Sequence, residues 1–135
     1  MRTRIHHFAE HYHLIGALVL AAHGAIHLMG FVLLWNVGQP SGLAYADMRP
    51  TPGTPGGEAV GLVWLAAALL FLMGASLLAT RRPGWDRFTL AGALVSLPAL
   101  LAVIGTAATG VALDAVIVAS LIIGRAPAAR SPDTP

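Results

Sequence analysis

Three long apolar runs constrain what this chain can fold into. They cover residues 14–35, 59–80 and 88–124, and Asp114 is the one Asp, Glu, Lys or Arg within them. A membrane-spanning helix needs about 20 apolar residues, so each of the first two runs predicts one span. As a single helix the third run would reach about 55 Å, at about 1.5 Å per residue, which is too long for one crossing. We therefore expect it to turn back within residues 105–110, Gly-Thr-Ala-Ala-Thr-Gly.

The expected fold is all-α: a single transmembrane domain over residues 1–135, built as an integral membrane four-helix bundle. Its helices are predicted at about 14–36, 58–80, 87–106 and 109–125. Pro98 lies inside the third of them, which membrane helices tolerate. Small residues, such as the Gly92-x-x-x-Ser96 pair, give the helices faces for close packing.

Composition excludes several other classes of protein. Hydrophobic residues make up 56% of the chain and charged residues 10%, against about 25% charged in soluble domains. A water-soluble domain and a disordered chain are therefore excluded. With so few charges the chain is not expected to bind nucleic acid. It has no cysteine, so disulfides, a thiolate nucleophile and a cysteine metal site are also excluded.

The arginines predict the orientation in the membrane. Arg49 lies in the loop 37–57, and the other arginines flank the predicted helices on the opposite side: Arg2, Arg4, Arg81, Arg82, Arg87, Arg125 and Arg130. Positive residues concentrate on the cytoplasmic side of membranes. We therefore expect a multi-pass protein of the cytoplasmic (inner) membrane with both termini cytoplasmic. The first apolar run exceeds the 7–15 residues usual for a signal-peptide core, so cleavage is not expected.

Two polar segments flank the predicted bundle. Residues 1–13 are expected to form an interfacial leader, because Ile5, Phe8 and Tyr12 follow a helical spacing among arginines and histidines. An amphipathic helix on the inner membrane surface and a polar leader without fixed structure both fit this pattern. Residues 126–135 are predicted to be a flexible tail.

A few ionisable residues interrupt the apolar helices and predict a functional site. His23 and His27 are four residues apart and share one helix face. Asp114 lies about one turn inside the last predicted helix, at the same outer level. Ionisable groups within a membrane usually face the protein interior or a cavity. We therefore predict a polar pocket that opens outward, and the residues expected at its rim are Asn36, Tyr45, Asp47, Glu58 and Trp64.

Three chemistries and one structural role fit these residues. His23, His27 and Asp114 could bind a lipophilic small molecule and act on it by acid–base catalysis, as an isomerase, cyclase, hydrolase or quinone-linked redox enzyme. The two histidines and a carboxylate are also a ligand set for Zn, Fe or Cu. One histidine could be an axial haem ligand. A His–Asp hydrogen bond could instead only hold helices together. No particular cofactor is identified.

The motif at residues 23–31, His-Gly-Ala-Ile-His-Leu-Met-Gly-Phe, resembles that of a known group of proteins. Gly-Leu-Val-Trp-Leu at 61–65 and Asp114 after Gly110 extend the similarity. Together these motifs resemble the DoxX-like group of small four-helix bacterial membrane proteins, which are mostly of unassigned function. The resemblance implies a bacterial inner-membrane component, sometimes linked to redox or quinone processes. Independently of the resemblance, the expected partner of the chain is the lipid bilayer, and a second copy of the chain, bound through outward-facing apolar surfaces, is an alternative. A further alternative is that the chain is a non-catalytic small subunit of a larger membrane complex.

Overall fold

The computed structural model describes residues 2–38, 49–102 and 104–125, and within these ranges the chain is helical with no strand. Its four helices are α1 (Arg2–Leu34), α2 (Pro55–Ala79), α3 (Trp85–Ala102) and α4 (Ile104–Arg125). The predicted all-α architecture of four helices is therefore confirmed. The predicted tail at 126–135 lies outside the described residues.

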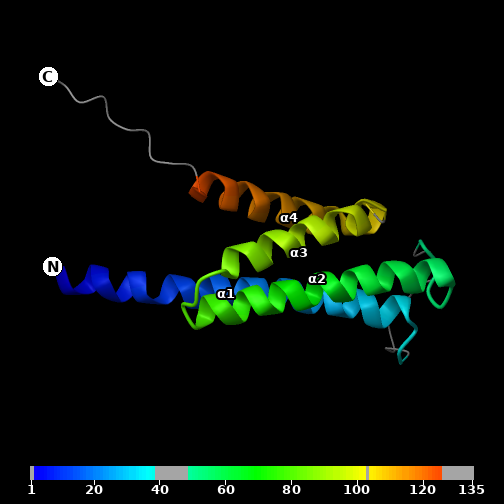
Figure 1. Cartoon of the computed structure of the whole chain (residues 1–135), viewed down its shortest axis with the longest axis horizontal. Coiled ribbons are helices and arrows are strands. Elements are labelled where there is room, and N and C mark those ends of the chain that lie inside the picture. The colour runs from blue at the N-terminus through cyan, green and yellow to red at the C-terminus, as the bar shows by residue number, and fades with distance from the viewer. Residues whose placement is uncertain (1, 39–48, 103, 126–135) are drawn as a thin grey trace, which may run out of the picture.

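The helices pack in the order in which they follow one another along the chain. α1 packs along α2, α2 along α3 and α3 along α4. Figure 1 shows that successive helices run in alternating directions, so that the start of α1, the connection from α2 to α3 and the end of α4 lie toward the left end of the bundle. The end of α3 and the start of α4 lie at the other end (Figure 1). Helices α1 and α4 are therefore the first and last members of the packing series.

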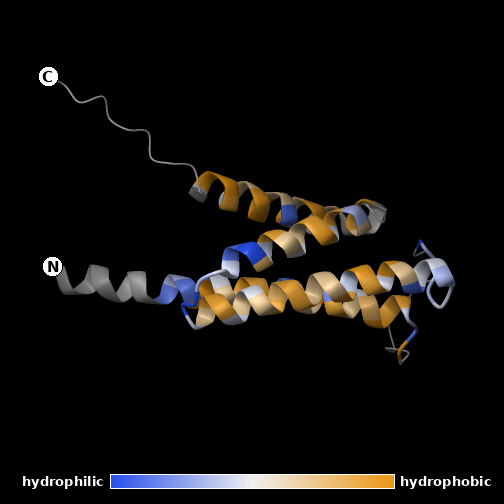
Figure 2. Ribbon diagram, in the orientation of Figure 1, coloured by the Kyte–Doolittle hydropathy of each residue, from blue (hydrophilic) through white to orange (hydrophobic). Residues whose placement is uncertain are grey.

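Two of these helices are long and apolar enough to cross a membrane. They are the part of α1 from His11 to Leu34 and the whole of α2, Pro55–Ala79. In α4 a shorter apolar stretch runs from Gly110 to Ile123. Figure 2 shows that apolar residues cover most of the helical length, whereas hydrophilic residues gather near the helix ends.

Helix α1 begins earlier than the sequence predicted. It runs from Arg2 without a break, so the predicted leader and the first span form one continuous helix. The segment 2–13 contains no Gly or Pro to interrupt the helix. Helix α1 ends just before Asn36, whose positive φ of 52° is a left-handed conformation that asparagine tolerates.

Helix α2 begins at Pro55, three residues before its predicted start at 58. Thr54 caps it, because its hydroxyl accepts a hydrogen bond from the Gly57 backbone N–H at 3.2 Å. Pro55 fits the first helical position, where a backbone N–H has no helical acceptor.

The predicted turn between the third and fourth helices is misplaced. The sequence assigned it to residues 105–110, but α4 begins at Ile104 and contains that whole segment, and α3 ends at Ala102 instead of 106. Gly110 explains part of the error. A Cβ at Gly110 would lie 3.2 Å from the Leu100 side chain, so this glycine lets α4 approach α3 closely. It serves packing between helices, whereas the sequence interpretation took it for turn chemistry.

The buried core consists of two clusters, one at each side of the predicted site. The first contains Leu20, Ala67, Phe71, Ala75 and Ala93, and the second contains Leu34, Trp64, Ala99 and Leu100. Small residues bring the helix backbones together between the bulky ones. At Gly30 of α1 the missing side chain makes room for the Trp64 ring of α2, since a Cβ there would lie 1.3 Å from Trp64 Cε3.

Candidate functional site

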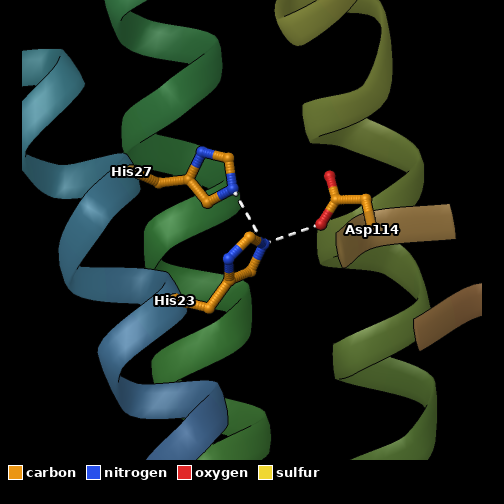
Figure 3. Close-up of side chains that lie close together, drawn as sticks. All are labelled: His23, His27 and Asp114. Carbon is orange, nitrogen blue, oxygen red and sulfur yellow. Dashed lines mark hydrogen bonds and ion pairs between the residues drawn. The ribbon is translucent and has the colours of Figure 1, made fainter. Parts of the chain in front are cut away.

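His23, His27 and Asp114 are brought together in the interior of the bundle. Their exposed fractions are 3%, 2% and 0%. The spacing of four residues places both histidines on one face of α1, and Asp114 reaches them from α4. Figure 3 shows both imidazole rings and the Asp114 carboxylate pointing toward one another. The structure thus joins residues from the first and last helices of the chain.

The polar atoms of the three side chains are in direct contact. His23 Nε2 lies 2.7 Å from Asp114 Oδ1, and His27 Nε2 lies 3.3 Å from His23 Nε2. The two imidazole rings meet edge to face, with their centroids 4.7 Å apart. One ligand atom from each residue lies within 4.8 Å of those of the other two. The three polar groups thus form a compact cluster in direct contact, and the predicted pocket that opens outward stays a prediction.

One hydrogen on His23 Nε2 cannot satisfy both of its polar neighbours. His23 Nε2 faces two electron-rich atoms, Asp114 Oδ1 and His27 Nε2, but an imidazole nitrogen carries at most one hydrogen. If that hydrogen is donated to Asp114, His23 Nε2 has no lone pair left to accept from His27. If His23 Nε2 is instead unprotonated, its single lone pair can accept a hydrogen from one of the two neighbours and not from both. A single positive centre among the three atoms would interact favourably with all of them.

Ser96 of α3 completes the surroundings of the carboxylate. Its side chain is fully buried, and its hydroxyl donates to Asp114 Oδ2. The Ala93 carbonyl, 3.1 Å away, is a second acceptor for the same hydroxyl. Asp114 is therefore contacted through both oxygens, by α1 at Oδ1 and by α3 at Oδ2. The sequence interpretation treated Ser96 as a small packing residue and did not predict this contact.

Aromatic rings of α2 form the wall behind the two histidines. The Phe71 ring stacks on His27, with a centroid distance of 5.5 Å, and meets His23 edge to face at 4.6 Å. The Trp64 ring lies 6.1 Å from the His27 ring. Phe71 and Trp64 belong to the two separate core clusters, so the polar site lies where these clusters meet. Sequence reasoning found Trp64 but missed Phe71, because an apolar ring in an apolar helix carries no distinguishing signal.

Glu58 does not join the site. It lies in the first turn of α2 with its side chain exposed, where the helix dipole and solvent favour a carboxylate. Its backbone carbonyl accepts a hydrogen bond from Trp35 Nε1 at 3.0 Å. Asn36 is also exposed, and Tyr45 and Asp47 lie outside the described residues. Among the described members of the predicted rim, Trp64 is the one whose side chain lies beside a histidine of the site, His27.

Two buried nitrogens have no hydrogen-bond partner among the residues that the structure describes. They are His23 Nδ1 and Trp64 Nε1. Buried polar atoms are usually paired with protein or water, so each is a point where a further polar molecule would be stabilised. Both atoms belong to residues of the site or of its wall.

The set of side chains has the composition of a metal-binding site. It offers two imidazole nitrogens and a carboxylate oxygen, a combination used by zinc and by non-haem iron. A haem is a poor fit, because the two Nε2 atoms lie 3.3 Å apart and face one another and Asp114.

No protein-family model, curated protein or solved structure matches this chain. The resemblance of residues 23–31 to the DoxX-like group therefore stays a prediction, and the function has to be argued from the site itself.

Proposed function

We propose that this chain is an integral membrane protein that binds one divalent transition-metal ion through His23, His27 and Asp114. The observation that supports it is the convergence of three metal-ligating atoms in the bundle interior, within 4.8 Å of one another. Burying a carboxylate and two imidazoles among apolar helices is costly unless their polar atoms are satisfied. A cation satisfies all three at once, which one shared hydrogen does not.

The distances fit a small ion after little adjustment. Zinc–nitrogen bonds of about 2.0–2.1 Å place the donor atoms of a tetrahedral site about 3.3 Å apart. The two Nε2 atoms are already 3.3 Å apart. The contact between His23 Nε2 and Asp114 Oδ1, at 2.7 Å, has the length of a hydrogen bond and would open slightly when an ion replaces the hydrogen.

The chemistry of the ligands limits which ion is bound. Two imidazoles favour Zn²⁺, Fe²⁺ or Co²⁺ over Mg²⁺ and Ca²⁺, which prefer oxygen ligands. The chain has no cysteine, so thiolate ligation does not contribute. Three protein ligands are fewer than the four typical of a structural zinc site, so one coordination position is left for an exogenous ligand.

Titration with Co²⁺ in mild detergent tests the proposal. We expect one ion per chain, seen as a visible absorption band, and its loss in His23→Ala, His27→Ala and Asp114→Ala variants. A matched control carries alanine at the leader histidines His6, His7, His11 and His13, so that binding by the leader is removed. This control should keep the band. A wild-type chain without a band, or a band lost only in the control, would overturn the proposal.

The placement in a membrane is supported by the outer surface of the helices. Large apolar side chains are exposed along it, with exposed fractions of 71% for Leu18, 62% for Ile26 and 73% for Ile123. A soluble monomer rarely exposes so continuous an apolar surface. Arg81, Arg82 and Arg87 lie together at the end of the bundle where α2 connects to α3, which favours a cytoplasmic position for that end.

Labelling of single cysteines tests this orientation, and the absence of native cysteine makes it direct. Glu58 and Arg82 are exposed at opposite ends of α2. In intact cells, a membrane-impermeant maleimide is expected to label a Glu58→Cys variant and to label Arg82→Cys only after permeabilisation. The reverse pattern would invert the proposed topology, and labelling of both in intact cells would contradict a spanning α2.

A second function, acid–base action on a lipophilic molecule, is favoured by one observation. The 2.7 Å contact between His23 and Asp114 is the arrangement in which a carboxylate orients a catalytic imidazole. In that case a small molecule should co-purify in mild detergent and be detected by mass spectrometry, and its retention should not change when metal is removed with EDTA. Loss of the molecule together with the metal would favour the metal centre.

A further inference from the structure

The two oxygens of Asp114 have different partners in the bundle. Oδ1 faces the histidines, at 2.7 Å from His23 Nε2, whereas Oδ2 accepts a hydrogen bond from the Ser96 hydroxyl. Ser96 and Asp114 both have an exposed fraction of 0%, so water does not compete at their surfaces. The carboxylate is thus held between α1 and α3 with its two oxygens turned to opposite neighbours.

We infer that Ser96 is a positioning residue that holds Asp114 Oδ2 away from the ion, so that Asp114 ligates through Oδ1 alone. The inference rests on the proposed metal centre and adds to it the residue that sets its coordination number. A carboxylate can bind a cation through one oxygen or both. A hydrogen bond to one oxygen fixes the orientation of the group and leaves the other oxygen for the ion.

A simpler explanation of Ser96 is that its hydroxyl only donates to a backbone carbonyl of its own helix, and Thr89 of α3 allows a comparison. Buried serine and threonine hydroxyls often donate to a carbonyl of the preceding turn, as Thr89 does to Trp85 O at 2.8 Å. Ser96 has such an acceptor in Ala93 O at 3.1 Å. It also contacts a carboxylate, and a hydrogen bond to an ionised acceptor is roughly twice as strong as one to a neutral carbonyl. Packing alone would require no hydroxyl at this position.

Co²⁺ binding by a Ser96→Ala variant tests the inference. Loss of an outer partner of a metal ligand typically weakens metal binding about 10–100-fold, and we expect a loss in this range. The visible band should also weaken, because a carboxylate free to use both oxygens raises the coordination number, and four-coordinate Co²⁺ absorbs more strongly than five- or six-coordinate Co²⁺. A change in coordination geometry is a signature that mere loss of packing would not produce.

Thr89→Val is the matched control, since it removes from the same helix a buried hydroxyl that donates to Trp85 O. It should bind Co²⁺ with wild-type affinity and spectrum. Ser96→Thr keeps a hydroxyl, so it should show the wild-type spectrum, provided that its helix content shows that the variant folds.

If Ser96→Ala folds and keeps both the wild-type Co²⁺ affinity and the wild-type spectrum, the inference is wrong and the metal centre stands. If the wild type binds no Co²⁺, the proposed function itself fails.

Discussion

Zinc is expected to stabilise the wild-type bundle by about 4 kcal/mol when its free concentration is one thousand times its Kd, because an ion that binds only the folded state shifts the unfolding equilibrium by mass action. The site joins α1 to α4, which are not consecutive in the packing series, so the ion would connect the two ends of the fold. The free energy of unfolding in mild detergent, measured with Zn²⁺ and with EDTA, gives the difference directly.

The same measurement separates a metal site from a structural hydrogen bond. Polar contacts between membrane helices contribute about 0.6 kcal/mol on average. If the His23–Asp114 contact is only such a bond, Zn²⁺ should have no effect on the stability of the wild type or of the His27→Ala variant. Under the metal proposal the Zn²⁺ effect is large in the wild type and in a His13→Ala control, and absent in His27→Ala. His13 lies on the same helix, where it accepts a hydrogen bond from Arg81.

Gly30→Ala adds a single methyl group, yet we expect it to lower the free energy of unfolding strongly. A Cβ at this position would lie 1.3 Å from Cε3 and 1.7 Å from Cζ3 of Trp64, so the rigid ring must move. Overpacking in a core costs about 1–3 kcal/mol, and we expect the upper end of this range or more. Because Trp64 also packs near His27, displacement of its ring should weaken Co²⁺ binding as well.

Two further variants provide the controls for this prediction. Gly56→Ala, in the first turn of α2, should change the free energy of unfolding little, since the nearest neighbour of its Cβ would be Pro50 Cβ at 3.9 Å. Adding Trp64→Leu to Gly30→Ala should recover part of the lost stability, because the smaller side chain leaves room for the methyl group. Strict additivity of the two changes in a double-mutant cycle would mean that the Gly30–Trp64 contact is not the cause.

Much of this site was predictable from sequence because polar residues are costly in apolar helices. His23 and His27 stand out in an uncharged run, and their spacing puts them on one face. Asp114 is the one carboxylate in the third apolar run. Because ionisable residues in membrane helices usually face the protein interior, it was expected to meet the histidines there. The structure brings these three together, whereas their chemical role stays a proposal.

Other features were hidden for equally physical reasons. Ser96 is small and occurs in a Gly-x-x-x-Ser pattern, so packing accounts for it without reference to Asp114. Glu58 was expected at the rim from its position near the start of a helix, but an exposed carboxylate there is already favoured by the helix dipole. The turn between α3 and α4 was misplaced because a glycine in the sequence is compatible both with a turn and with a close contact between helices, and Gly110 serves the second.

The separation of the contributing residues along the chain has a consequence for biosynthesis. His23 and Asp114 are 91 positions apart. During translation α1 and α2 emerge first, so Trp64 and Phe71 can enclose the imidazoles before the carboxylate has been synthesised. A chain that ends before α4 therefore lacks one of the three side chains of the cluster, however well α1 packs against α2. Completion of the cluster is thus tied to the arrival of α4, and under the proposed function metal binding would report that α4 has joined α1.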